Sequence, residues 1–304
     1  MTSSPRDVIN SRYGIRLALW LGRVMPIGLG KRVVRMAADY ISRHADWEMV
    51  RAVRANRWVV SGETLQGQAL DQAVQATFRH TANSIFMFYH HLNDLEAMRS
   101  MIIDCDHSLE QLIQRPLYES RGVVVVAAHM GNYELIGQVA AMLAFKAMVL
   151  TLPDLTGGYK LQYENRRKMG VNLVPASMSS IRQAVDHLRA GGMALTGIDY
   201  PEKSLNYRPL FFNRPSALPV HHIVLALRAN VPIRFINIFL NSEGKYEVSF
   251  SDPIEMVHCA DHRQEINSNA EAVLKVAEGY IRQAPDQWMM TFPVWPEALE
   301  QVPG

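Results

Sequence analysis

The stretch Arg121-Gly-Val-Val-Val-Val-Ala-Ala-His129-Met-Gly-Asn132-Tyr-Glu134 carries the strongest structural signal in the chain. Its apolar run of four valines and two alanines is too short to cross a membrane, and the β-branched composition favours a strand buried on both faces. Asn132 can cap a helix whose apolar positions continue to about Phe145. The stretch therefore predicts a buried strand, a short loop and a helix, the unit from which parallel α/β sheets are built.

Two residues of this stretch carry side chains suited to proton transfer. His129 directly follows the strand, and Glu134 lies in the first turn of the predicted helix. Open α/β sheets usually bind ligands beside the carboxyl ends of their strands, which is where His129 would lie. From the first helical turn, the carboxylate of Glu134 can fold back toward the imidazole. We interpret the pair as a base and its orienting carboxylate; the alternative is a histidine with a purely structural role.

From residue 121 onward, short apolar runs alternate with segments of helical periodicity, which predicts an α/β fold with a mostly parallel central sheet flanked by helices. The run 193–198 delivers Asp199 at its carboxyl end, so Asp199 and His129 can face the same crevice. The loop 200–219 is long enough to suggest a functional role. Strands are predicted at 122–128, 147–152, 171–174, 193–198, 233–240 and 246–250, and helices at 132–145, 157–169, 179–190, 220–229 and 262–284.

The amino-terminal part has a different character. Residues 31–116 show helical periodicity and no convincing strand. Residues 13–30 are apolar but contain Arg16, Arg23 and Pro26, so they fall short of the about 20 mostly apolar residues of a spanning helix. We interpret them as an interfacial helix lying on the membrane; the alternatives are an amphipathic helix packed on the core and a marginal single span. The expected organisation is a helical region, 1–116, packed on an α/β core, 117–304.

Charge is distributed unevenly along the chain. Residues 1–60 hold eleven Lys/Arg and four Asp/Glu, a net charge of +7, whereas the remainder holds twenty and twenty-five, a net charge of −5. Basic residues interleaved with Leu, Ile, Trp and Met suit an anionic membrane surface better than nucleic acid, for which no recognisable binding module is present. The two cysteines, Cys105 and Cys259, lie far apart and predict neither a disulfide framework nor a metal knuckle.

Several common catalytic motifs are absent from the sequence. It contains no G-x-S-x-G nucleophile elbow, no H-E-x-x-H zinc motif and no P-loop, and Gly28-Leu-Gly30 lacks the third glycine of a dinucleotide fingerprint. A covalent or metal-assisted mechanism therefore has little support, and we expect neither a metal nor a cofactor. A histidine with a carboxylate can still activate a hydroxyl of the substrate, which then serves as the nucleophile.

The His129-x4-Glu134 motif after a hydrophobic strand resembles the His-x4-Asp/Glu motif of glycerolipid and lipid A acyltransferases. Further motifs follow in the order of the family, although Asn213 stands where a glycine is usual. Together they resemble the bacterial lipid A biosynthesis (lauroyl/myristoyl) acyltransferase family, which includes phosphatidylinositol mannoside acyltransferases. These motifs are Arg166-Arg-Lys-Met-Gly170 with Val174-Pro175, Gly197-Ile-Asp199, Pro209-Leu-Phe-Phe-Asn-Arg-Pro-Ser-Ala-Leu-Pro219, and Glu278-Gly-Tyr-Ile-Arg-Gln-Ala-Pro-Asp-Gln-Trp288 with Trp295.

The resemblance implies a glycerolipid acyltransferase-like fold and an O-acyltransferase at the cytoplasmic face of the bacterial inner membrane, bound peripherally or monotopically. The donor would be a thioester of acyl-CoA or acyl carrier protein, used as a co-substrate, and the acceptor a hydroxyl of a lipid or glycolipid. His129 is then the general base and Glu134 its orienting partner. Backbone N–H groups around Met130-Gly131 and the guanidinium of Arg166 are expected to stabilise the oxyanion, and Met130, Gly131, Asn132 and Arg166 to bind substrate.

Asp199 is expected to contact the polar head of the acceptor or the histidine network. For Arg166 and Asp199 the alternative is a structural ion pair. Two other readings of the function remain open. The acceptor could be a lysophospholipid or an amine on a natural product, or the chain could be a non-catalytic lipid-binding homologue. The intact set of His129, Glu134, Arg166 and Asp199 favours an enzyme.

Overall fold

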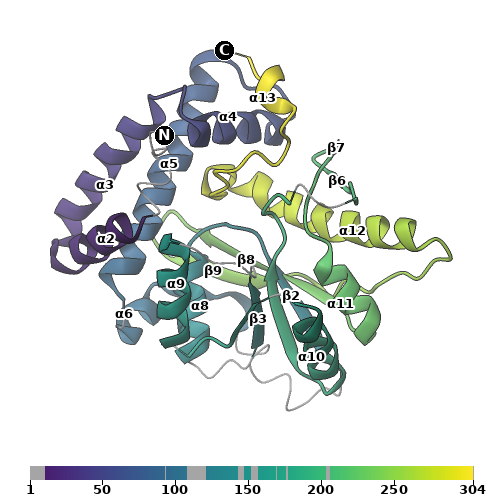
Figure 1. The fold of residues 1–304 in the computed structure, drawn as a ribbon. Coiled ribbons are helices and arrows are strands. Elements are labelled where there is room, and N and C mark those ends of the chain that lie inside the picture. Colours follow the sequence, from purple (N-terminus) through teal and green to yellow (C-terminus); the bar gives the residue numbers. More distant parts are fainter. Residues whose placement is uncertain are drawn as a thin grey trace.

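A computed structural model describes residues 11–92, 94–107, 121–142, 147–151, 157–168, 170–175, 177–202 and 206–303. Its centre is a seven-stranded sheet with the strand order β1-β9-β8-β2-β5-β3-β4. All neighbouring strands are parallel except β8 and β9, which form a hairpin, so the predicted mostly parallel sheet is confirmed (Figure 1). The strands are β1 (Ile102–Asp104), β2 (Val123–Ala127), β3 (Ala147–Thr151), β4 (Leu173–Pro175), β5 (Met193–Gly197), β8 (Ile233–Leu240) and β9 (Tyr246–Phe250).

The valine run forms β2, in the middle of the sheet, and is buried on both faces as expected. Val124 and Val126 join one hydrophobic cluster, whereas Val123 and Val125 join another, because successive side chains of a strand point to opposite faces. The first cluster is covered by α10 (Met178–Arg189), α11 (His221–Ala229) and α12 (His262–Gln283), and the second by α6 (Leu95–Ser100) and α8 (Tyr133–Met142). The run is therefore continuous because neither face of the strand meets water.

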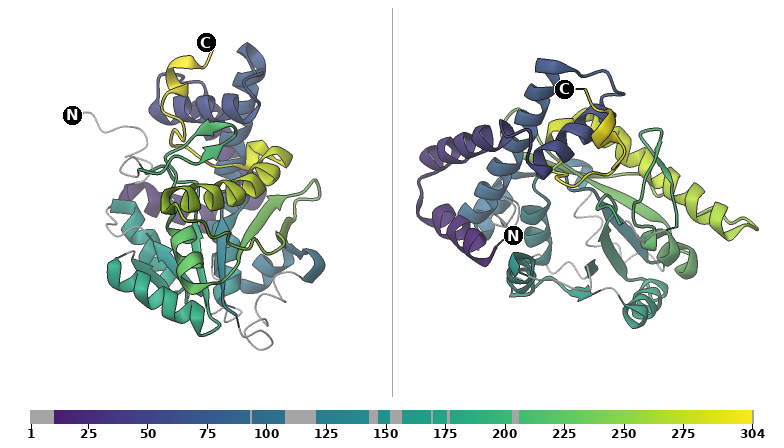
Figure 2. Two further views of the ribbon diagram at one scale, coloured as in Figure 1. Left: turned by 90° about the vertical axis from the view of Figure 1, so that its right-hand side faces the viewer. Right: turned by 45° about the horizontal axis from the view of Figure 1, so that its top comes forward.

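The amino-terminal helices pack around one long helix. That helix, α5 (Gly67–His90), contacts α2 (Arg12–Val24), α3 (Ile27–Ser42) and α4 (Glu48–Val60), and also the short helix η3 (Pro285–Gln287) near the carboxyl terminus. The last helix, α13 (Ala298–Gln301), packs against α4. The carboxyl-terminal segment therefore packs against α4 and α5, while α2 and α3 lie at the periphery (Figures 1 and 2).

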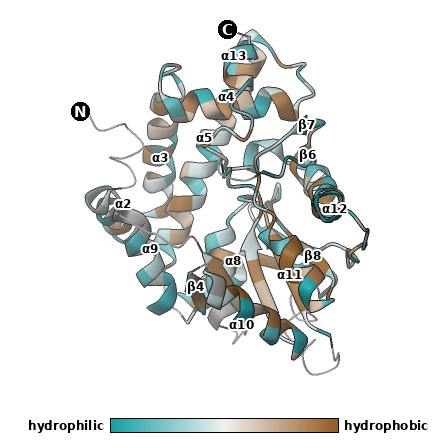
Figure 3. Ribbon diagram, turned by 45° about the vertical axis from the view of Figure 1, so that its right-hand side comes forward, coloured by the Kyte–Doolittle hydropathy of each residue, from teal (hydrophilic) through white to brown (hydrophobic). Residues whose placement is uncertain are grey.

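The apolar segment 13–30 is divided between two helices, because α2 ends at Val24 and α3 begins after Pro26. None of the described helices combines the length and the apolar character that crossing a membrane requires. Hydrophobic and hydrophilic residues are mixed along α3 (Figure 3).

From residue 121 onward, each predicted strand and helix is present, and its described ends lie within two residues of the predicted bounds; α9 spans Gly157–Lys168. The short helices η3 and α13 were not predicted. The end of the helix predicted at 132–145 lies outside the described residues. Two expectations were wrong. Residues 31–116 contain the strand β1, whose three residues pair only with β9 at an edge and leave little local signal. The loop 200–219 contains a hairpin, formed by β6 (Leu210–Phe211) and β7 (Arg214–Pro215).

Candidate active site

The loop after β2 takes its shape from a glycine and an asparagine. Gly131 has φ +59°, and a Cβ atom added there would lie 2.4 Å from the backbone oxygen of Ile238, so only glycine fits. Asn132 then begins helix α8 as predicted, because its Oδ1 accepts a hydrogen bond from the backbone N–H of Leu135 at 3.3 Å. The loop therefore turns sharply directly after His129.

A segment near the carboxyl terminus holds this loop in place. The backbone N–H of Met289 donates to the backbone oxygen of His129 at 2.7 Å, and that of Gly131 donates to the backbone oxygen of Gln287 at 3.2 Å. The intervening residue, Trp288, is 2% exposed. The backbone on both sides of the imidazole is thus fixed by residues more than 150 positions later in the chain.

His129 and Asp199 meet because their strands are neighbours. β2 and β5 are parallel with Ala127 opposite Gly197, so the residues two positions later also lie level. His129 Nδ1 lies 2.6 Å from Asp199 Oδ1, and the backbone N–H of His129 donates to Asp199 Oδ2 at 2.8 Å. The indole N–H of Trp288 also donates to Oδ2, at 2.8 Å. Asp199 is therefore buried with both carboxylate oxygens satisfied.

The two side chains shift each other's proton affinity. Burial would lower the pKa of His129, but the negative charge of Asp199 and the hydrogen bond between them outweigh burial and raise it above the ordinary 6.5. For Asp199, burial acts to raise the pKa, and the interactions with His129 and Trp288 lower it below the ordinary 3.8. The carboxylate is thus ionised at neutral pH and fixes the proton of the neutral imidazole on Nδ1, leaving Nε2 as the acceptor.

Glu134 has a different partner from the one that the sequence pattern predicted. It lies in the first turn of α8, and both of its carboxylate oxygens contact Arg166 on α9, with Arg166 Nε donating to Oε2 at 2.9 Å. The expected Glu134–His129 pair is therefore wrong, since Asp199 occupies the Nδ1 side of the imidazole. Burial would lower the pKa of Arg166, but Glu134 raises it, so the guanidinium stays charged.

A comparison with protein families identifies the family of this sequence. The model of the bacterial lipid A biosynthesis acyltransferase family matches residues 9–296. The chain belongs to this family. It is thus an acyltransferase, and the family in general uses an acyl thioester donor and a lipid acceptor. None of the curated proteins matches the chain significantly.

In this acyltransferase the expected oxyanion donors in the loop are already engaged. The backbone N–H of Met130 donates to the backbone oxygen of Ala128 at 2.8 Å, and that of Gly131 donates to Gln287 as described. Neither N–H group is free to stabilise an oxyanion. Arg166 keeps one nitrogen available, because within the described part of the chain its Nη1 has no acceptor.

The side chains of this loop also have structural roles. Met130 is 2% exposed and belongs to the hydrophobic core. The Nδ2 group of Asn132 donates to the backbone oxygen of Ser84 at 3.0 Å and to the hydroxyl of Tyr246 at 3.2 Å. Together with the capping bond, these contacts engage both polar atoms of the Asn132 side chain. The residues 130–132 expected to bind substrate therefore build the loop of the acyltransferase.

Trp288 and Tyr133 were missed as site residues. Trp288 was noted only as part of a family motif, yet it bonds the carboxylate that orients His129. The ring of Tyr133 lies edge-on to the imidazole of His129, with 5.1 Å between the ring centroids. A tryptophan far from the motif carries no local signal for this contact, whereas Tyr133 directly precedes Glu134 and could have been considered from its position.

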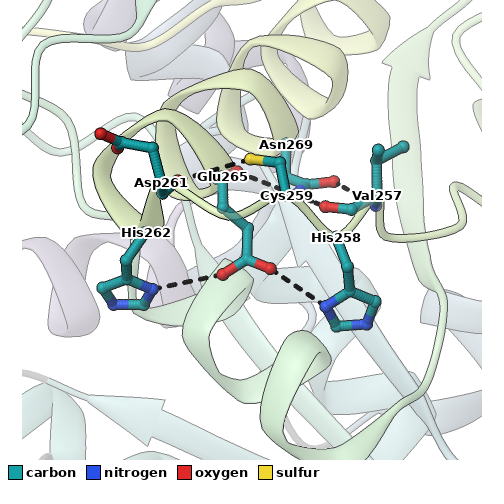
Figure 4. A network of polar contacts seen from close by, with 7 residues as sticks. All are labelled: Val257, His258, Cys259, Asp261, His262, Glu265 and Asn269. Carbon is teal, nitrogen blue, oxygen red and sulfur yellow. Dashed lines mark hydrogen bonds and ion pairs between the residues drawn. The ribbon is translucent and has the colours of Figure 1, made fainter.

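A second group of imidazoles lies at the start of α12. His258 Nδ1 lies 3.0 Å from one carboxylate oxygen of Glu265, and His262 Nδ1 lies 3.2 Å from the other. The two rings approach the carboxylate from opposite sides (Figure 4). In the described residues of the acyltransferase, no group of three or more His, Cys, Asp and Glu side chains is placed to hold a metal ion.

Proposed function

We propose that the enzyme is a membrane-associated O-acyltransferase that moves a fatty acyl group from acyl-CoA or acyl carrier protein to a hydroxyl of a lipid or glycolipid. The observation that carries this proposal is the His129–Asp199 pair at the ends of two neighbouring parallel strands. The side chain of His129 is 31% exposed and that of Asp199 is 1% exposed. The imidazole can therefore reach a substrate while its carboxylate partner stays shielded from water.

The proposed reaction uses Nε2 of His129 as the general base. The acceptor hydroxyl gives its proton to Nε2 as its oxygen attacks the carbonyl carbon of the thioester. The tetrahedral intermediate collapses, the carbon–sulfur bond breaks, and the thiolate takes the proton from the imidazolium. Asp199 stabilises the imidazolium and holds the ring, as the carboxylate of a catalytic triad does. The products are the ester and the free thiol.

Arg166 is the residue that we propose for stabilising the oxyanion. Its Nη1 group has no acceptor within the described residues. Its positive charge acts to lower the pKa of His129, so the guanidinium is close enough to interact with the imidazole. Glu134 fixes the guanidinium through Nε and Nη2. A cation held by a carboxylate is preorganised, so little reorganisation is needed when charge develops on the oxygen. Glu134 therefore acts through Arg166 as a positioning residue.

Helices α2 and α3 support peripheral binding at the cytoplasmic face of the inner membrane. Large hydrophobic side chains are exposed on both helices, with Trp20 at 59% and Met36 at 71%. Arg16 and Arg23 are exposed on α2, and more basic residues follow on α3. Aromatic and aliphatic side chains beside arginines are the composition of helices that lie in the headgroup region of anionic membranes.

The His129→Ala variant tests the proposed base. We expect it to lower acyl transfer from an acyl-CoA or acyl carrier protein thioester to a lipid acceptor by a factor of about 10² to 10⁴. The matched control is His258→Ala, which removes another imidazole held by a carboxylate and should leave turnover unchanged. Near-normal turnover of His129→Ala, with circular dichroism matching the wild type, would contradict the assignment.

The acceptor is identified by mass spectrometry of lipids from a strain lacking the protein. We expect one lipid or glycolipid species to become lighter by one acyl chain, and expression of the wild type to restore it while His129→Ala does not. Purified lysophospholipid, glycolipid and amine acceptors then distinguish the remaining substrate classes. Binding of lipid without turnover of any of them would favour a non-catalytic homologue.

A further inference from the structure

Arg57 is a buried cation that has no partner in the described chain. It lies in the last turn of α4 and is 8% exposed. Within the described residues, its Nε and Nη1 atoms have no hydrogen-bond acceptor, and they are shielded from solvent. The Nη2 atom is not among the buried atoms without a partner. An arginine stays charged in proteins, and a buried charge without a partner is as destabilising as breaking a buried ion pair. Such a group calls for a physical explanation.

The surroundings of Arg57 connect it to the segment that holds the active-site loop. The preceding residue, Asn56, donates to the backbone oxygens of Met290 at 3.1 Å and Phe292 at 2.8 Å, and accepts from the backbone N–H of Val294 at 3.1 Å. This tail directly follows Trp288, whose indole bonds Asp199. Helix α4 thus packs on the same tail that fixes His129.

The neighbouring helix α5 also contacts the loop that follows His129. His80 Nε2 lies 3.3 Å from the backbone oxygen of Gly131, in the loop after His129. Burial lowers the pKa values of both Arg57 and His80, and the charge of Asp286 opposes this shift in each. Asp286 is therefore near both side chains, but it forms no ion pair within 4.0 Å with Arg57.

The structural alternatives do not account for Arg57. A cation in the last turn of a helix gains from the helix dipole, but this gain is far smaller than the cost of burying the charge and supplies no hydrogen bond. Arg54 on the same helix is paired, by contrast: it contacts Asp71 and donates to the backbone oxygen of Pro303 at 3.2 Å. Arg57 therefore has the features of a cation whose counter-ion is a ligand.

We propose that Arg57 binds a phosphate or phosphodiester group of a substrate, beside the tail that fixes the catalytic loop. Guanidinium groups pair strongly with phosphate oxygens through charge-assisted hydrogen bonds. This inference rests on the proposed acyl transfer, in which both substrates can carry phosphate. The group belongs either to the phosphopantetheine or nucleotide part of the acyl donor or to the headgroup of the lipid acceptor.

The first test compares Arg57→Met with Arg54→Met, which removes a paired arginine from the same helix. Without ligand, we expect Arg57→Met to unfold at the same or a higher temperature than the wild type, because it removes an unpaired buried charge. Arg54→Met should unfold at a lower temperature. If Arg57→Met is as destabilised as Arg54→Met, Arg57 has a structural role and the proposal is wrong.

The second test measures binding, which does not depend on turnover. The probes are coenzyme A and a short-chain phosphatidic acid, with inorganic phosphate for comparison, titrated by calorimetry into the full-length wild type and both variants. We expect one of the first two probes to bind Arg57→Met about 10- to 100-fold more weakly than the wild type, as losing a hydrogen bond to a charged group predicts. Arg54→Met should bind it as the wild type does.

The identity of that probe distinguishes a donor phosphate from an acceptor phosphate. Equal affinity of the wild type and Arg57→Met for every probe would overturn the proposal, even if His129→Ala abolishes acyl transfer. Weaker binding by Arg57→Met would support it even if acyl transfer is not the reaction. In the active enzyme, Arg57→Met should raise KM for the same substrate about tenfold or more and change kcat much less.

Discussion

At the scale of single residues, the site depends on which carboxylate reaches the imidazole. Asp199 is 1% exposed and accepts hydrogen bonds from the ring of His129, from its backbone and from Trp288. Glu134 is five residues from His129 in the sequence but binds Arg166. The active protonation state of His129 is therefore controlled by Asp199.

The pH dependence of the reaction follows from this pair. A general base must be unprotonated, so activity is lost as the pH falls through the pKa of His129, which Asp199 raises above 6.5. As the pH is lowered, kcat/KM of the wild type should reach half of its maximum at a midpoint above pH 6.5. In Asp199→Asn the raising charge is absent, so this midpoint should move to lower pH.

Asp199→Asn should also lower kcat, by a factor on the order of 10³ to 10⁴, because an amide can hold the imidazole in the wrong tautomer. Trp288→Phe is the control, since it removes one hydrogen bond to the carboxylate but keeps the charge. Its loss of activity should be much smaller. A pH profile of Asp199→Asn that coincides with the wild type would show that Asp199 does not set the pKa of His129.

At the scale of elements, the hairpin β6–β7 contains backbone strain that a single substitution can relieve. Its two turn residues, Phe212 and Asn213, have φ values of 51° and 60°, the left-handed conformations of a type I′ turn. Glycine is preferred at the second of these positions, and Asn213 is exposed without a hydrogen bond in the described structure. Phe212, by contrast, is buried and packs edge-on against Trp295.

We expect Asn213→Gly to raise the free energy of unfolding by about 0.5 kcal/mol, since relief of left-handed strain slightly outweighs the entropy that glycine loses on folding. Asn213→Ala removes the same side chain but keeps the strain, and should lower stability by about 1 kcal/mol. Urea denaturation measures both. Equal stabilities of the two variants would show that backbone strain is not what limits this hairpin.

At the scale of the whole molecule, distant parts of the chain converge on the loop after β2. Helix α5 contacts this loop through His80, helix α4 holds the carboxyl-terminal tail through Asn56, and the tail itself bonds His129. Two further amino-terminal helices, α2 and α3, lie at the periphery (Figure 2). Both expose apolar and basic side chains. The amino-terminal region thus supports the site, and α2 and α3 carry the surface that we propose for membrane binding.

Neutralising two arginines of that surface tests its role. Each basic residue near an anionic membrane contributes about 1 kcal/mol, so the double variant Arg16→Gln, Arg23→Gln should bind anionic vesicles about 10- to 30-fold more weakly at low salt. Arg182→Gln, Arg228→Gln changes the net charge equally on the exposed surface of α10 and α11 and should have little effect. Vesicle sedimentation measures both. Equal sedimentation of the two double variants would contradict an electrostatic role of α2.

Local sequence patterns correctly predict the α/β class, most strands and helices from residue 121 onward, and the positions of His129 and Asp199 at strand ends. These features depend on local periodicity and on the rule that parallel strands share a carboxyl edge. Only the tertiary structure decided that β2 lies beside β5, which brings Asp199 to His129 and leaves Glu134 to Arg166. It likewise brought Trp288 to Asp199 and enclosed Arg57, which has no partner among the described residues. Strand order and long-range packing bring together residues that are far apart in the chain. The spacing of residues within the sequence therefore does not specify which of two carboxylates, Glu134 or Asp199, bonds the imidazole of His129.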